Sequence, residues 1–308
     1  ALAMALGCDG VQAMDLVQAY RDALANDAVV ASVRAQLDAT RERVPQAQAG
    51  LLPVVNGSAV VNRQMVDTNL APRRDFTSQN YSVNLSYPLY RLQNVETLAQ
   101  SKLQVAIGEA ALAQAQQDLA VRVSQAYFDV LAAQDSLATI RAQKRAITEQ
   151  LASAKRNFEV GTATITDTRE AQARFDLGTF QELAAENDLR TKRLALDTLV
   201  GRSAVEPRPL RVPVVLPAPV PANPEDWVTL ADQGHPAVQR ARIGLEVAQL
   251  ETTKARAGES PTVDAVGSLS ASNSRGSLPE LNRSTGTTTV ASLGVQLNWP
   301  LYTGGATQ

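Results

Sequence analysis

A long proline-free stretch carries the clearest pattern of apolar positions in this sequence. The 118 residues from Leu89 to Glu206 contain no proline, the residue that breaks helix interiors. Within this stretch apolar residues recur at alternating steps of three and four, the pattern of a coiled-coil seam. Ten of eleven seam positions are apolar, the exception being Lys144: Val123, Ala126, Val130, Ala133, Leu137, Ile140, Lys144, Ile147, Leu151, Ala154 and Phe158.

A second helical segment follows and fits the same pattern less well. Its matching positions are apolar, whereas Glu182 and Lys192 are charged at places where the seam requires apolar residues. Helices as long as the first, roughly 100 Å for 66 residues, need lateral partners along their length. The matching positions of the return segment are Ala171, Phe175, Ala185, Leu189, Leu196 and Leu199.

Residues that end and start helices lie between these two segments and predict a hairpin. Gly161 can adopt the left-handed conformation that ends a helix. Asp167, with Glu170 three residues later, fits a capping box that starts the return helix, and Gly201 would stop that helix. Residues 93–201 are therefore predicted to form an antiparallel helical hairpin with the tip VGTATITD.

Two segments before the hairpin have the pattern of strands. Residues 54–62 are rich in β-branched side chains, and residues 81–87 alternate, with Tyr81, Val83, Leu85 and Tyr87 on one face. Residues 63–80 are polar and are expected to form a loop. Such alternation fits a half-buried strand in a soluble sheet, and it equally fits a membrane barrel strand with one face to lipid.

An internal repeat is the most informative feature of the chain. The residues AGLLP at 49–53 match AGESP at 257–261, an offset of 208, and VNLSYPLY at 83–90 matches VQLNWPLY at 295–302, an offset of 212. The helix before each pair also corresponds. Two strands per repeat cannot form a stable sheet alone, so the strands 51–62, 79–90, 261–272 and 290–302 are expected to adjoin one another and further copies.

The repeats are separated by a proline-rich segment. Seven prolines fall between residues 207 and 224, which predicts an extended linker. The expected divisions are therefore a first repeat at 14–206, the linker at 207–224, and the beginning of a second repeat at 225–308. We expect this second repeat to be truncated, because its own hairpin would begin near residue 308.

Composition narrows the possible functions. The 308 residues include 49 alanines but only 4% aromatic residues, which suits close helix contacts better than a wide globular core. The net charge of -2 gives no reason to expect nucleic-acid binding. One Cys and one His exclude a disulfide framework or structural zinc site within one chain. No metal site, cofactor or catalytic motif is indicated, and no apolar stretch is long enough for a transmembrane helix.

The first 13 residues are typical of a secretory signal whose beginning is missing. They start with an apolar run, and Val11-Gln12-Ala13 places branched or small residues, with Ala last, at the positions that a signal peptidase recognises. Leu6-Gly7-Cys8 also partly matches a lipoprotein cleavage site, so lipid attachment at Cys8 stays open. An ordinary apolar helical turn is the third possibility.

Residues 14–308 resemble the TolC-type outer-membrane efflux proteins. The resemblance depends on AYFDVLAAQDSL in the long helix, RNFEVGTATITDTREAQARFD across the tip, and the repeated PLY. It implies a mainly α protein with some β structure, in which a long helical hairpin belongs to an α-barrel. The hairpin would be joined to four amphipathic strands of a β-barrel shared by a homotrimer in the outer membrane and extending into the periplasm.

The resemblance also implies roles for particular residues. Asp167 would belong to an acidic ring that gates the tunnel, although a plain helix cap explains it as well. Exposed residues of the tip would dock an adaptor, unless the tip is a simple turn: Phe158, Val160, Gly161 and Thr162. Aromatic residues near the ends of the second strand of each repeat would lie at the membrane interface, or else close a soluble core: Tyr87, Tyr90, Trp299 and Tyr302.

Two functions follow from this reading. The first is a non-enzymatic outer-membrane channel subunit of a tripartite efflux pump or type I secretion system, in contact with outer-membrane lipid. It would be a passive duct for drugs or secreted protein, opened when a periplasmic adaptor and an inner-membrane pump or ABC transporter dock. The second is a soluble periplasmic coiled-coil adaptor or scaffold, which would also contain helical hairpins.

Overall fold

The computed structural model describes residues 13–68, 71–211, 213–275 and 287–305. The predicted signal segment, including Cys8, lies outside these residues except for Ala13. The chain forms two compact units. One comprises residues 1–35 and 111–236, and the other comprises residues 36–110 and 237–308. None of the described helices is long and apolar enough to cross a membrane.

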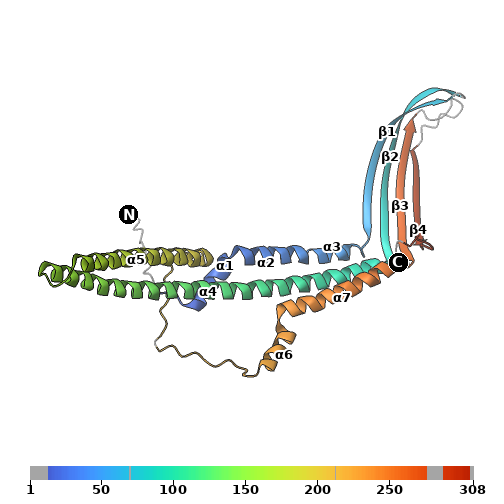
Figure 1. Cartoon of the computed structure of the whole chain (residues 1–308). Helices are drawn as coiled ribbons and strands as arrows, with labels where there is room; N and C mark the ends of the chain where they lie inside the picture. Colours follow the sequence, from blue (N-terminus) through green and yellow to red (C-terminus); the bar gives the residue numbers. More distant parts are fainter. Residues whose placement is uncertain (1–12, 69–70, 212, 276–286, 306–308) are drawn as a thin grey trace, which may run out of the picture. The chain divides into compact units, whose positions relative to one another are not determined.

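The first unit is built around the predicted helical hairpin. Helix α4 (Leu92–Glu159), whose first residues belong to the other unit, and helix α5 (Ile165–Val200) lie side by side (Figure 1). Helix α1 (Leu16–Asn26) and the start of α2 (Ala28–Arg41) pack against them, and α6 (Pro224–Gly234) follows the linker. Ala19 and Ala23 on α1 are completely buried, because their small side chains allow close helix approach.

The hairpin is confirmed, and the predicted seam of α4 is buried or half-buried up to Ala154, whereas its last residue, Phe158, is 43% exposed. Val123, Val130 and Leu137 of α4 are buried, as are Leu189 and Leu196 of α5. Gly161 and Gly201 have φ angles of 78° and 73°, a conformation that a residue with a Cβ rarely adopts. Both glycines therefore end their helices as predicted.

The cap of α5 differs from the prediction. Thr164, not Asp167, is the N-cap residue, and Asp167 is the third residue of the helix, completing a capping box with Thr164. The box therefore starts three residues earlier than the prediction that paired Asp167 with Glu170. Thr164 serves because its hydroxyl accepts a hydrogen bond from the amide of the third helical residue.

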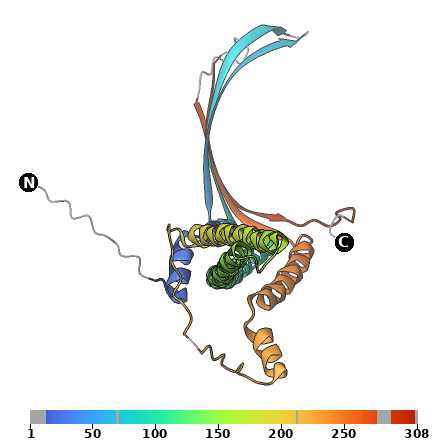
Figure 2. The ribbon, with the colours of Figure 1, turned by 60° about the vertical axis from the view of Figure 1, so that its left-hand side comes forward.

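The second unit contains a four-stranded antiparallel sheet. Its strands are β1 (Val54–Thr68), β2 (Ala71–Tyr90), β3 (Thr262–Arg275) and β4 (Thr287–Asn298), in the order β1-β2-β3-β4. The strands bend together along their length (Figure 2). The loop expected at 63–80 was wrong, because most of these residues extend β1 and β2. Cross-strand partners such as Arg63 and Thr77 continue the ladder, so polar character there does not end pairing.

The pairing register follows the internal repeat. Val54 pairs with Ser86, and the residues 208 and 212 positions later, Thr262 and Asn298, pair with each other. The two offsets in the sequence therefore correspond to one pairing register that the hairpins of both repeats share. β2 and β3, which are far apart in the chain, pair along their length and join the two repeats.

The second unit also contains helices from both repeats, namely α3 (Arg43–Ala49), α7 (Pro236–Ala257) and the first part of α4. Helix α4 continues through Gly108 without a break. A Cβ on Gly108 would lie 3.0 Å from Leu37 Cδ1, so this glycine permits close packing with α2. α4 also contacts α7, where Gln100 donates to Glu251 at 2.7 Å.

Candidate functional site

The predicted docking residues gather at the tip between α4 and α5. Phe158 and Val160 are 43% and 72% exposed. The turn is closed by backbone hydrogen bonds, because the N–H of Thr162 donates to the Asn157 carbonyl at 2.8 Å and Gly161 donates to Phe158 at 3.0 Å. The tip thus presents two apolar side chains to solvent on a hydrogen-bonded turn.

Asp167 lies beside the tip in an open groove between the two helices. Its carboxylate accepts from the N–H and the hydroxyl of Thr164, both at 2.8 Å. These hydrogen bonds lower the pKa of Asp167 below its ordinary value of 3.8. The groove, of about 220 Å³, is lined by Asp167 together with Ile147, Gln150, Glu170, Ala171 and Arg174. The carboxylate is therefore ionised at neutral pH and accessible.

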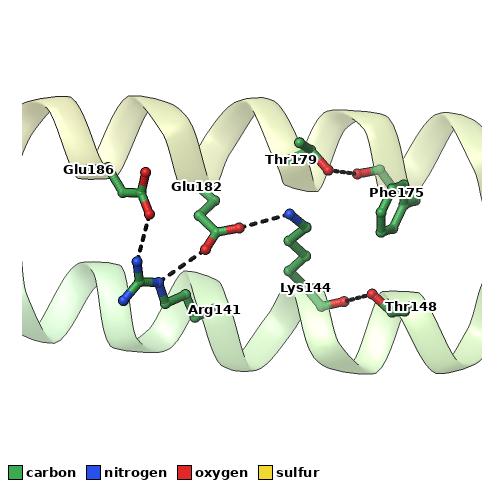
Figure 3. Close-up of polar contacts among 7 residues, drawn as sticks. All are labelled: Arg141, Lys144, Thr148, Phe175, Thr179, Glu182 and Glu186. Carbon is green, nitrogen blue, oxygen red and sulfur yellow. Dashed lines mark hydrogen bonds and ion pairs between the residues drawn. The ribbon is translucent and has the colours of Figure 1, made fainter.

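Two charged residues that did not fit the apolar pattern of the seam, Lys144 and Glu182, form an ion pair with each other. Lys144 Nζ lies 2.8 Å from Glu182 Oε2, and Arg141 contacts the other oxygen of Glu182 at 3.0 Å (Figure 3). Arg141 also contacts Glu186 at 2.6 Å. We call Arg141, Lys144, Glu182 and Glu186 the seam charge cluster. Hydrogen bonds from Lys144 first, and then from Arg141, lower the pKa of Glu182 below 4.5.

The second misfit of the return helix is also paired across the hairpin. Lys192 Nζ lies 3.0 Å from Asp129 Oδ2, and hydrogen bonds from Lys192 and Gln125 lower the pKa of Asp129 below 3.8. For Lys144 and Glu182 the signal was present in the sequence as opposite charges at seam positions of the two helices, whereas Asp129 stands next to the seam position Val130. The signal could not be used without knowing which positions face each other.

Tyr127, within the motif AYFDVLAAQDSL, was not assigned a role from the sequence. Its side chain is buried, and its hydroxyl lies 3.1 Å from the carbonyl oxygens of both Met14 and Arg208. The hydroxyl also accepts from the Arg208 N–H at 2.9 Å. Burial raises the pKa of Tyr127. One neutral phenol thus fastens the segment before α1 and the start of the linker to α4.

The sheet has one apolar face. Because successive residues of a strand point to opposite faces, cross-strand partners form rows on one side. One such row is Gly57, Val83, Leu269 and Ala291. The next is Val55, Leu85, Gly267 and Leu293, in which Leu293 is 86% exposed. Contiguous exposed apolar surface of this kind marks an interaction surface.

The opposite face of the sheet is mainly polar. One row contains Asn56, Asn84, Ser268 and Ser292, and the next contains Ser58, Ser82 and Ser270 with the apolar Val290. Hydroxyl groups bond across the strands, at 2.7 Å between Ser58 and Ser82 and at 2.8 Å between Ser268 and Ser292. One face of the sheet therefore suits an apolar environment, and the other suits water.

The four predicted aromatic residues lie where β2 and β4 end. Tyr87 and Tyr90 belong to β2, whereas Trp299 and Tyr302 follow β4, and all four are exposed. Pro88 does not end its strand, although proline often does, because β2 continues to Tyr90 past a register shift. The shift accommodates a residue that lacks the backbone N–H needed for the ladder.

An ion pair joins the two repeats at this end of the sheet. Arg91, directly after β2, donates to both carboxylate oxygens of Asp264 on β3, at 2.9 and 2.8 Å. The Asp264 side chain is only 13% exposed, whereas that of Arg91 is 41% exposed. Asp264 is the cross-strand partner of Pro88, so the pair bridges the register shift.

The described residues contain no group of three or more His, Cys, Asp or Glu side chains that could hold a metal ion. The chemistry that the described residues do present consists of exposed apolar surface, ion pairs and hydrogen bonds. Such groups recognise and position partners.

Comparison with known proteins places the chain in a family. The family model described as "Outer membrane efflux protein" matches residues 19–202 and 227–308. The chain is 34% identical to outer membrane protein TolC of Vibrio cholerae, over 96% of this chain and 67% of that protein. It is 30% identical to the proteases secretion protein PrtF of Dickeya chrysanthemi, over 98% of this chain and 67% of PrtF. The chain belongs to the outer membrane efflux protein family.

The fold agrees with this membership. The crystal structure of the Campylobacter jejuni CmeC outer membrane channel matches 95% of this chain and 62% of CmeC, with a TM-score of 0.78 at 17% identity. The predicted fold class, a long helical hairpin joined to four strands of a shared barrel, is confirmed by this likeness and by the antiparallel sheet. The chain spans about two thirds of the length of TolC of Vibrio cholerae and of PrtF.

Proposed function

We propose that the protein is a subunit of an outer-membrane channel that serves a tripartite efflux pump or a type I secretion system. It resides in the outer membrane and reaches into the periplasm. Membership of the outer membrane efflux protein family supports export, and likeness to a protein named for protease secretion extends the possible cargo from small drugs to proteins.

The observation that carries the proposal is the two-faced sheet. In a membrane barrel the apolar face contacts lipid and the polar face lines a water-filled lumen. The rows through Leu269 and Leu293 fit the first solvent, and the rows through Ser82 and Ser268 fit the second. Four strands cannot close a barrel, so closure requires further copies, which we infer to form a homotrimer.

Partners would act at the other end of the channel. The exposed Phe158 and Val160, on the turn made by Gly161 and Thr162, form the docking surface for a periplasmic adaptor. An inner-membrane pump or ABC transporter would supply the energy, because a duct of this kind carries out no catalytic step and needs no cofactor. Three copies of the ionised Asp167 would form the acidic ring of the gate.

The remaining assignments follow from this architecture. The aromatic residues at the ends of β2 and β4 would anchor the barrel at the membrane–water boundary, where such side chains concentrate. Residues 14–206 and 225–308 would be the first repeat and the beginning of the second, joined by the linker at 207–224. A soluble adaptor is the less favoured function, since it has no use for the exposed apolar face.

Charge placed on either face tests the lipid assignment. Leu269 and Ser270 are neighbours on β3 and point to opposite faces. In the protein produced from its own gene, Leu269→Lys should reduce the heat-resistant oligomer recovered from outer membranes. The expected destabilisation is about 2–4 kcal/mol for a lysine near the bilayer midplane. Ser270→Lys should leave recovery near that of the parent. Equal recovery of both variants, or parent protein in the detergent-free soluble fraction, would overturn the proposal.

A further inference from the structure

The apolar seam alone does not determine how far α5 is shifted along α4. Seam positions recur every seven residues, so a shift of one heptad again places apolar residues together. Ile147 now faces Gly178, where an added Cβ would lie 3.6 Å from Ile147 Cδ1. After a shift of seven residues, Ile147 would face Ala171 or Ala185, which are also small and apolar.

The seam charge cluster distinguishes among these alignments. A shift of seven residues would take Lys144 away from Glu182, toward Leu189 or toward Phe175, whose ring centroid already lies 5.5 Å from Lys144 Nζ. It would also place the Glu182 carboxylate against Leu137 or Leu151, both of which are buried. A buried charge without a partner is strongly unfavourable, so only the observed alignment satisfies both helices.

The geometry of the cluster strengthens this discrimination. Glu182 uses both carboxylate oxygens, one for Lys144 and one for Arg141, and Arg141 reaches on to Glu186 (Figure 3). The contacts therefore extend over one turn of each helix. The side chains of Lys144 and Glu182 are only 23% and 21% exposed, so water would compensate poorly for a lost partner.

We propose that the seam charge cluster sets the register of the α4–α5 hairpin and thereby positions the tip and Asp167. Its members are positioning residues, because a heptad shift would force the turn at 160–164 to change its length and conformation. Desolvation offsets much of the stability that a partly buried pair contributes, whereas specificity for one alignment is retained. This register is a property of the hairpin whether or not the protein is a channel.

Apolar replacement separates a role in register from a role in stability. Lys144→Leu combined with Glu182→Leu should leave the melting temperature unchanged or raised, because an apolar pair of similar size suits the seam. The same variant should permit the shifted alignment. A role confined to stability predicts the reverse, namely lower melting temperature and unchanged register.

Cysteine crosslinking in the full protein measures the register directly. The single native cysteine is first removed by Cys8→Ser. The pair Ile147→Cys and Gly178→Cys reports the observed alignment, and the pair Ile147→Cys and Ala185→Cys reports the shifted one. With a short bis-maleimide, which alkylates both cysteine thiols, the ratio of the two crosslinks should fall about tenfold in the double-leucine variant, as expected for coupled partners.

Two further variants make the result decisive. A full exchange of Arg141→Glu, Lys144→Glu, Glu182→Lys and Glu186→Lys should keep the ratio within about twofold of the parent, because every contact has its charges reversed together. The control Glu170→Arg combined with Arg174→Glu, which exchanges an exposed pair within α5, should not change the ratio. The proposal would be overturned if the ratio of the two crosslinks stayed unchanged in the double-leucine variant. It would also be overturned if that ratio fell in the full exchange as far as it is expected to fall in the double-leucine variant.

Discussion

At the scale of single residues, the start of α5 shows how one carboxylate can serve structure and still be available for function. Asp167 closes the capping box with Thr164, yet its side chain also lines an open groove. The sequence predicted a cap at this position but placed its beginning at Asp167. Threonine and aspartate both satisfy the requirements of an N-cap, so sequence alone could not choose between them.

Two substitutions separate the cap from the proposed gate. Thr164→Ala should lower the free energy of unfolding by about 1 kcal/mol, because it removes an N-cap hydroxyl, and should leave cation selectivity unchanged. Asp167→Asn should reduce cation selectivity, because it removes the charge of the acidic ring. Thermal unfolding and single-channel recording in planar bilayers would measure these effects. Thr166→Ala, outside the cap, is the control, and equal selectivity in all variants would exclude the gate.

At the scale of elements, the heptad pattern predicted the hairpin and its apolar contacts, but not its ion pairs. Lys144, Glu182 and Lys192 broke the pattern when each helix was considered alone. Their complementarity becomes visible only when the register between the helices is known. Strand lengths failed for a related reason: residues 63–80 lack apolar alternation, although cross-strand pairing continues through them.

Acidification should weaken the hairpin in a defined pH window. The pKa values of Glu182 and Asp129 are lowered from 4.5 and 3.8 in the folded protein. Their ionised forms therefore stabilise the fold above these ordinary values, and this stabilisation is lost as the pH falls through the lower folded values. The melting temperature from helical circular dichroism should stay nearly constant from pH 7 to about 5 and fall below about 4.

A variant isolates the contribution of Glu182 from that of other carboxylates. Glu182→Gln should show a smaller decrease in melting temperature between pH 5 and 3 than the parent, because it cannot lose the charge that binds Lys144 and Arg141. Glu170→Gln, an exposed substitution in the same helix, should follow the parent curve. Identical curves for all three proteins would show that the seam charge cluster does not titrate in this window.

At the scale of the whole molecule, the internal repeat predicted more of the fold than any single element did. The offsets of 208 and 212 anticipated two hairpins of equal register, as Val54–Ser86 and Thr262–Asn298 show. The sequence did not reveal the ion pair between Arg91 and Asp264. No equivalent exists at the matching positions of the other repeat, where Asn56 and Thr303 stand.

Loss of the Arg91–Asp264 pair should loosen the connection between the repeats. Asp264→Ala should cost about 1–2 kcal/mol in the free energy of unfolding, measured by urea titration in lipid vesicles. The value is that of charged hydrogen bonds, reduced because Arg91 is partly exposed. Asp75→Ala in the same sheet is the matched control. Its partner Arg63 lies 3.8 Å away and is 79% exposed, so the cost should stay below about 0.5 kcal/mol. Equal costs would contradict this role for Asp264.

The outermost strands of the sheet have a consequence for biogenesis. Within the described strands, β1 and β4 pair on one side only, so each leaves a ladder of backbone donors and acceptors without cross-strand partners. Before assembly, an isolated subunit would therefore have two unpaired edge strands that can pair with each other between copies. Head-to-tail pairing of this kind produces either a closed ring or an open-ended filament. If the protein assembles into the proposed channel, these two edges would have to stay covered until lipid has fixed the curvature of the sheet.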